Sequence, residues 1–563
     1  MGVMSSADRT SIERILCWTA LFTTLLVTPW ASYDPINVPK LAVISIGGFT
    51  ALCGLIAVGG ITRQKQMWPV LVLMAAFVGD LTIVLFVSGT NFSQSFFGTF
   101  GRATGYVAYI ALAALLVVAA QLANTDTLKR ISNYLLLAGL LSLLYGVIQI
   151  LSLDPFNWAN QYTPVIGFLG NPNFQSSFLG FSGVLAFALL IGPGRSWSIR
   201  FGFFVFIVAL TIVIGETESQ QGILVLLGGI TIIFCMWIQK SKIKFLSIPA
   251  YAFSLIGATL VALGSLNKGP LASLLFQDSL TYRGDYWRAG WKMTIENPIF
   301  GVGLDSYGDW YRRARTVEAT VRRGPDVTSN AAHNVLLDFS SNGGLPPLVI
   351  YLSITLLVIT SIVKVLKRSV EFDPVFSGLV AVWVAYQAQS IISLNQLGLA
   401  VWGWIISGLI IGFEINTRNK TGISTEETPH RRKTTPKNSP KETSPRIVLG
   451  ITSGILIGSL IGMPPLISSV QFKSALESGN PDAIEKSATY SPSSCQHVLL
   501  IASIFANNKL ENRALDVLNS GKDKSPECFE IWKAIYQLSS PNSLEQEKAQ
   551  ANMKRLDPNN PDL

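Results

Sequence analysis

The sequence predicts an all-α polytopic membrane protein with about 12 transmembrane helices plus a thirteenth, a large extracytoplasmic helical loop and a C-terminal helical-repeat domain. Charged residues make up only 14% of the 563 residues, whereas 49% are hydrophobic. Soluble domains carry roughly 25% charged residues. The apolar residues form runs of about 17–22 residues, long enough to cross a hydrocarbon core of roughly 30 Å. Soluble chains do not sustain so many such runs, so we interpret them as membrane spans.

Twelve of these apolar runs precede residue 415 and a thirteenth follows it. They cover residues 14–31, 40–60, 69–87, 104–121, 131–151, 174–192, 201–215, 221–238, 246–264, 345–363, 375–391, 397–413 and 447–467. The first run contains Pro29 and lacks a small-x-small cleavage site. We therefore expect it to remain as a helix and not to be removed as a signal peptide.

The basic residues of the short loops predict the orientation of the chain. With the N-terminus in the cytoplasm, alternate loops hold pairs such as Lys129/Arg130 and Arg195/Arg200, and the opposite loops are nearly free of them. Cytoplasmic loops of membrane proteins are enriched in Lys and Arg. This pattern places residues 265–344 outside the cytoplasm. It also attributes the net charge of +9 to topology, not to a nucleic-acid-binding surface.

Composition divides the chain into four parts: a membrane domain (1–413), a linker (415–446), a further span (447–467) and a tail (470–563). The linker is rich in Thr, Ser, Pro and Lys, with eight Lys/Arg against three Asp/Glu. Such a segment has too few apolar residues to fold, so we expect it to be disordered and cytoplasmic. Its positive charge is consistent with a solvated retention signal or with a contact to anionic lipids.

The tail has a helical pattern that repeats after 34 residues. Ser491-Pro492 recurs as Ser525-Pro526, and Leu510-Glu511 recurs as Leu544-Glu545. A helical hairpin of this period resembles tetratricopeptide repeats. Two or so repeats do not form a long solenoid, so we expect the tail to pack on residues 265–344 or on a protein partner. Cys495 and Cys528 lie in the tail, where a disulfide and free thiols are both consistent with the sequence.

Residues 265–344, here called the long loop, are where polar chemistry can occur in this otherwise apolar chain. They contain seven Arg and His333. Aromatic and apolar residues recur at helical spacing up to Asn297-Pro298, which predicts a helix that ends there. The following Gly301-Val302-Gly303 predicts a tight turn against another surface. We expect His333 to lie on a short helix at the membrane face.

The order of residues in the long loop resembles the O-antigen ligase and polymerase superfamily of bacterial membrane glycosyltransferases. The matching residues are Arg283, Trp287, Pro298, Gly301, Gly303, Tyr307, His333 and Asn334. The resemblance extends over about residues 40–413. It implies transfer of a polyprenyl-diphosphate-linked glycan to a lipid, glycan or protein acceptor on the outer side of the bacterial plasma membrane. It also implies that the reaction needs no metal or other cofactor.

The resemblance and the chemistry together suggest a role for each candidate site residue. A diphosphate leaving group needs cations, and the planar guanidinium of Arg holds two phosphate oxygens. Arg283 is the first candidate and Arg288 the second. His333 is the candidate base for the acceptor hydroxyl, or it hydrogen-bonds a phosphate, and Asn334 is a candidate substrate-binding residue. In-line displacement at the anomeric carbon predicts inversion.

One position departs from the family pattern. Many members carry an Arg before the eighth span, and Gln220 occupies that place here. Gln donates a hydrogen bond but supplies no charge. Arg102, at the outer end of the fourth span, is the candidate for the missing cation.

Other functions remain open at the level of sequence. A polymerase of the same superfamily uses the same donor as a ligase. A metal-dependent transferase would need acidic residues, and the first outer loop has only Asp34, although Glu216 and Glu218 are elsewhere. A polysaccharide or lipid-linked sugar transporter and an assembly scaffold are the remaining alternatives. The cluster Arg312, Arg313, Arg315, Arg322 and Arg323 is consistent with a solvated surface or with attraction of anionic lipids and acidic glycans.

Overall fold

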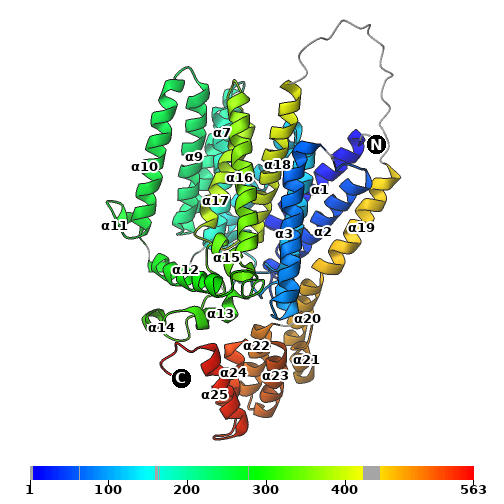
Figure 1. Ribbon diagram of the computed structural model, residues 1–563, viewed down its shortest axis with the longest axis vertical. Helices are drawn as coiled ribbons and strands as arrows, with labels where there is room; N and C mark the ends of the chain where they lie inside the picture. Colours follow the sequence, from blue (N-terminus) through cyan, green and yellow to red (C-terminus); the bar gives the residue numbers. More distant parts are fainter. Residues whose placement is uncertain are drawn as a thin grey trace.

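The computed structural model describes residues 4–61, 64–158, 163, 165–276, 278–421, 444–492 and 494–563. This part of the chain is 76% helical and contains no strand, so the predicted all-α class is confirmed. Figure 1 shows a bundle of long helices, with the helices of the long loop and the tail together at one end. The long loop and the tail therefore share one side of the bundle.

All thirteen predicted apolar runs fall on helices of the described chain. These helices are α1 (Ser6–Leu25), α2 (Asn37–Ala57), α3 (Trp68–Val87), α5 (Tyr106–Leu122), α6 (Thr125–Ile150), α7 (Pro172–Ile191), α8 (Trp197–Glu216), α9 (Gln220–Lys240), α10 (Ser247–Ser265), α16 (Leu345–Arg368), α17 (Pro374–Ser390), α18 (Leu397–Thr421) and α19 (Pro445–Gly462). Short 3₁₀ turns, Lys65–Met67 and Lys244–Leu246, precede α3 and α10, and a third turn, Gly167–Leu169, precedes α7.

Ten helices of the described chain are long and apolar enough to cross a membrane, which makes this a multi-pass membrane protein. The helices α1, α5 and α17 are outside these ten. Helices α5 and α17 each have 17 residues, or roughly 26 Å at 1.5 Å per residue. Helix α1 begins earlier than predicted and includes the charged residues Asp8, Arg9 and Glu13. The predicted count of 12 plus one is therefore not confirmed.

Helices α18 and α5 form the centre of the bundle. The apolar stretch of α18 is entirely buried, and α5 packs along it. Trp402 of α18 is fully buried, and its indole N–H donates to the hydroxyl of Thr24 at 2.8 Å. Helix α10 is the opposite case, because none of its apolar stretch is buried and it packs mainly on α9. The rim of the bundle therefore faces lipid, and its centre is an ordinary side-chain core.

Helix α19, which leads to the tail, packs on α2 through a stripe of glycines. Gly450, Gly454, Gly458 and Gly462 recur every four residues and are all buried. A Cβ atom at Gly454 would overlap backbone atoms of Phe49 and Thr50 in α2. Small residues at this spacing let two membrane helices approach closely.

Replacing Gly454 by valine should separate α19 from α2 and lower the stability of the protein in detergent. Overpacking a tight contact costs typically about 1–3 kcal/mol. The measurement is the midpoint of thermal unfolding of the full chain. Thr452→Val is the matched control, because Thr452 is exposed on the same helix. An equal loss in both variants would contradict the role of the glycine stripe.

Two predicted boundaries differ from the structure. Helix α18 continues to Thr421, into the predicted linker, where Arg368 and Arg418 form ion pairs with Glu414 at 2.7 and 2.5 Å. Helix α19 ends at Gly462, earlier than the predicted 467, because Pro464-Pro465 begins a new helix. Residues 422–443 of the linker lie outside the described residues, so its predicted disorder stays a prediction.

The tail consists of three pairs of packed helices. They are α20 (Pro464–Ser478) with α21 (Pro481–Ser487), α22 (Cys495–Asn507) with α23 (Glu511–Lys524), and α24 (Phe529–Leu538) with α25 (Leu544–Leu556). Cys495 and Cys528 form a disulfide that joins the starts of α22 and α24. The tetratricopeptide-like assignment itself stays a prediction.

Candidate active site

Helix α12 (Asp278–Glu296) carries the first half of the candidate site across the end of the bundle (Figure 1). Tyr286, Ala289 and Met293 lie on its buried side. Trp291 and Ile295 are more than half exposed, so only part of the predicted apolar stripe faces the protein. Arg283 is partly buried, and this burial lowers its pKa. A guanidinium keeps its positive charge at neutral pH even so.

The glycine turn after α12 connects it to α15 (Val335–Gly343), as predicted. Gly301 and Gly303 have φ angles of +59° and +102°, which residues with a Cβ rarely adopt. The amide of Val302 donates to the carbonyl of Ser341 at 2.8 Å, and that of Gly303 donates to Asn342 at 3.0 Å. Both halves of the long loop are thereby held together at this point.

His333 lies before α15 and not on it, so the predicted helical position is wrong. The side chain of Asn334 accepts hydrogen bonds from the amides of Leu336 and Leu337 at 3.0 and 3.1 Å. This N-cap begins the helix after Asn334. His333 adopts a φ of +51°, and its ring stacks on Tyr286 with the ring centroids 5.4 Å apart. The side chain of Asn334 therefore has a structural role as the N-cap of α15, in addition to its candidate role in substrate binding.

The environment of His333 strongly favours the neutral imidazole. Burial, together with the smaller effect of the positive charges of Arg283 and Arg102, lowers the pKa of His333 to about 4. These three candidate residues from the sequence analysis are thus close enough to interact electrostatically. A neutral imidazole can accept a proton from a hydroxyl group.

Arg102 is buried between two carboxylates from the long loop. It forms ion pairs with Asp305 at 3.5 Å and with Asp338 at 3.7 Å, and it donates to the carbonyl of Asn330 at 2.5 Å. Asp338 also accepts from the amide of Ala332 at 2.8 Å. Arg102 therefore ties the segment before His333 to the membrane domain. The sequence pattern does not single out Asp305 and Asp338, although a buried Arg requires such partners.

The remaining candidates lie apart from His333 in their described contacts. Arg288 is 61% exposed and pairs with Asp285 at 3.7 Å. Gln220 begins α9, and its amide donates to the carbonyl of Leu274 in α11 (Ala272–Leu275) at 3.2 Å. The structure thus brings together His333, Arg283 and Arg102 more closely than Arg288 or Gln220.

The arginine cluster of the long loop has two uses that its sequence did not reveal. Arg322 pairs with Asp285 at 3.2 Å, and Arg323 lies over the ring of Tyr282 at 4.1 Å. Both arginines lie in the last turn of α14 (Val317–Arg323), and their contacts hold α14 against α12.

The other arginines of the cluster bind the tail. Arg312 and Arg315, on and just after α13 (Tyr307–Ala314), pair with Asp557 at 3.1 and 2.5 Å. All three side chains are buried, and Arg312 also pairs with Glu530 at 2.7 Å. We call Arg312, Arg315 and Asp557 the tail clamp. It confirms the expectation that the tail packs on the long loop, and it shows these two arginines to be neither a solvated surface nor a lipid contact.

Two cysteines and a glutamate of the tail lie close together. Cys495, Cys528 and Glu530 converge within 4.8 Å of one another. Metal ligation requires a thiolate, and both sulfur atoms are in the disulfide. This group is therefore part of the tail's covalent framework.

A comparison with protein families matches residues 204–352 to the family described as O-antigen ligase. No curated protein matches the chain. The matched segment runs from α8 into α16 and contains the whole long loop, with Arg283 and His333. It indicates a membrane glycosyltransferase-like ligase or polymerase that uses lipid-linked glycans. This match over residues 204–352 supports the O-antigen ligase superfamily.

Proposed function

We propose that the protein transfers a polyprenyl-diphosphate-linked glycan to an acceptor hydroxyl on the outer side of the bacterial plasma membrane, without a metal and with inversion. The observation that carries this proposal is the position of neutral His333, stacked on Tyr286 and within electrostatic reach of Arg283. A base and a cation at one place are what this displacement requires. The family match supports the same class of reaction.

In the proposed step, His333 takes the proton of the acceptor hydroxyl as the oxygen attacks the anomeric carbon. The bond between that carbon and the phosphate oxygen breaks, and polyprenyl diphosphate leaves with the electron pair. Arg283 stabilises the negative charge that develops on the leaving group, because charge-assisted hydrogen bonds to phosphate are strong. Arg102 holds the His333 segment in place through Asn330 and Asp338. Arg288, Gln220 and Asn334 remain candidates for binding other parts of the substrate.

Reconstitution with a defined donor tests the proposal. Purified protein in detergent receives polyprenyl-diphosphate oligosaccharide and envelope extract, with and without chelator. Release of polyprenyl diphosphate in chelator, together with sugar of inverted configuration on an acceptor, is the expected result. A ladder of lengthened donors would make the protein a polymerase, and a single capped acceptor would make it a ligase. Folded protein that consumes no donor would contradict transfer and favour transport.

The pH dependence of the reaction should report the pKa of His333. Because burial and two positive charges lower this pKa to about 4, kcat/KM should stay level from pH 7 to about pH 5 and fall only below that. Removing the charge at Arg283 favours the imidazolium, so Arg283→Gln should move the acid limb of the profile to higher pH. Arg288→Gln is the control, because Arg288 is exposed and should leave the limb in place. An acid limb that stays in place in Arg283→Gln would contradict the assignment.

A further inference from the structure

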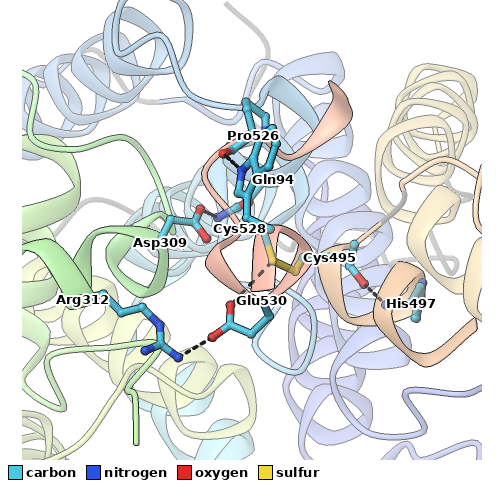
Figure 2. The surroundings of a disulfide bond; sticks show 10 residues. Gln94, Asp309, Arg312, Cys495, His497, Pro526, Cys528 and Glu530 are labelled. Atoms are coloured by element: carbon cyan, nitrogen blue, oxygen red, sulfur yellow. Dashed lines mark hydrogen bonds and ion pairs between the residues drawn. A yellow bond between two sulfur atoms is a disulfide. The ribbon is translucent and has the colours of Figure 1, made fainter. Parts of the chain in front are cut away.

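The tail, the long loop and the N-terminal part of the membrane domain enclose a cavity of about 250 Å³. We call it the tail cavity. Some residues between Asn91 and Gly101 of the membrane domain line this cavity. The long loop contributes residues between Gly308 and Arg312 and the segment Thr328–Asn330, and the tail contributes residues around the disulfide. Figure 2 shows Gln94, Asp309, Arg312, Glu530 and His497 around the disulfide. Small-molecule sites measure roughly 300–1,000 Å³, so this cavity suits one or two sugar rings.

The tail cavity borders the segment of chain that carries His333. Asn330, three positions before His333, lines it, and the carbonyl of Asn330 accepts from Arg102. Arg102 in turn pairs with Asp338, which holds the amide of Ala332. A group bound in the tail cavity would therefore contact the segment, residues 330–333, that positions the proposed base His333.

Two polar atoms in the cavity wall lack a hydrogen-bond partner among the described residues. They are Nε2 of His497 and Oγ of Ser93, and both atoms are buried. His497 is only 6% exposed, and its ring lies against Phe472 and Phe100 with centroid distances of 3.9 and 4.9 Å. Buried polar atoms in proteins are nearly always hydrogen-bonded. A hydroxylated ligand in the cavity would supply the missing partners.

The described wall of the tail cavity offers an anionic ligand no unpaired cation, because its one arginine, Arg312, already pairs with Glu530 and Asp557. Asp309 is partly buried and accepts from the amide of Gln94 at 2.8 Å, and Glu530 pairs with Arg312 at 2.7 Å. Asp34 and Glu527 also line the cavity, and Glu527 forms ion pairs with Arg313 and Arg555. Phe97, Phe100 and Phe529 add aromatic surface. Carboxylates accept hydrogen bonds from hydroxyl groups, and side-chain amides both accept from them and donate to them. Aromatic rings cover the apolar faces of sugars.

We propose that the tail cavity is an acceptor subsite that binds one or two uncharged sugar residues of the acceptor glycan. This inference rests on the proposed function, and it assigns the two substrates to opposite parts of the site. The diphosphate of the donor requires the cationic side at Arg283, whereas the described wall of the tail cavity offers it no unpaired cation. Because the tail walls the cavity, the tail is a determinant of acceptor choice.

The test measures binding separately from transfer. Saturation-transfer NMR is recorded on the full-length protein in detergent, without donor, using methyl hexosides and methyl N-acetylhexosaminides as probes. A methyl glycoside of a uronic acid and a serine-containing peptide are the competing classes. The neutral glycosides should bind, and the uronic acid should bind at least tenfold more weakly. Binding of the peptide alone, or equal binding of the uronic acid, would overturn the proposal.

Two variants and one control locate the binding to the cavity. Asp309→Asn removes a wall carboxylate, and Ser93→Phe fills the cavity from the side of α4 (Phe92–Phe97). Each should weaken glycoside binding by tenfold or more. Asp516→Asn makes the same chemical change as Asp309→Asn at an exposed tail position and should leave binding unchanged. Resistance of the tail to protease checks folding, and unchanged binding in both cavity variants would contradict the subsite.

The outcomes separate this inference from the proposed function. Glycoside binding that depends on the cavity, in a protein that consumes no donor, would retain the subsite and reject transfer. Donor consumption with a KM for acceptor that is unchanged in Asp309→Asn and Ser93→Phe would retain transfer and reject the subsite. When both proposals hold, these variants raise the acceptor KM at least tenfold and leave the donor KM unchanged.

Discussion

Replacing His333 should lower the rate of glycan transfer by about 10²–10⁴-fold, the range that general base catalysis contributes. The loss should appear in kcat, because the imidazole acts on the acceptor hydroxyl during the chemical step. Release of polyprenyl diphosphate under saturating donor measures it. His430→Ala serves as the matched control, since His430 lies in the linker far from the family motifs in sequence.

The backbone at His333 calls for two variants in place of one. His333 has a φ of +51°, and alanine there would retain a strain of roughly 1–2 kcal/mol, whereas glycine adopts this conformation without it. If the imidazole is the base, His333→Gly and His333→Ala lose activity equally, and added imidazole restores part of it beside Tyr286. If strain or packing explained the effect, His333→Gly would be the more active variant and imidazole would not help.

Replacing Asp557 by alanine should destabilise the docking of the tail by about 3–5 kcal/mol, the range for removing one partner of a buried ion pair. Asp557 is fully buried between Arg312 and Arg315. Its loss leaves Arg315 without a carboxylate partner in the tail clamp and leaves Arg312 with Glu530 alone. The measurement is the protease resistance of the tail and the thermal unfolding of the full chain.

The control for the tail clamp is Asp562→Asn, because Asp562 is exposed a few residues away. A second comparison is the pair Lys533–Asp326 across the same interface, where Asp326 is 70% exposed. Exposed ion pairs contribute about 0–1 kcal/mol, so Asp326→Asn should change docking little. High salt should weaken the exposed pair and spare the buried one. A tail that stays equally protected in Asp557→Ala would show that apolar contacts alone hold it.

The sequence predicted the helices of this protein better than their partners. Apolar runs and the pattern ending at Asn297-Pro298 depend on neighbouring residues, and the structure places helices there. The position of His333 was wrong because Asn334 caps the next helix, a local competition that apolar spacing does not register. The buried arginines pair with carboxylates that are about 200 residues or more away in the chain. Arg102 pairs with Asp305 and Asp338, and both Arg312 and Arg315 pair with Asp557. No local pattern encodes such pairings.

The glycine stripe of α19 is a different case, because its four-residue period was visible. By hydropathy alone, glycine is only a weakly apolar residue, so the stripe does not stand out from the apolar run that contains it. Its meaning depends on the backbone distance to α2, and a repeat of glycines at i, i+4 and i+8 is a known signal for that approach. The candidate site shows the same division. Arg283 and His333 were identified from the motif, and the residues that position them became visible only in the fold.

Because α19 packs closely on α2, the tail that follows it is a tethered ligand of the long loop. A binding module on a short linker meets its target at an effective concentration of about millimolar. The tail clamp therefore closes within one molecule, and losing one exposed contact changes its occupancy very little. The same surfaces would associate far more weakly if the tail were supplied as a separate chain. Complementation with two fragments would thus underestimate a contact that is nearly permanent in the intact protein.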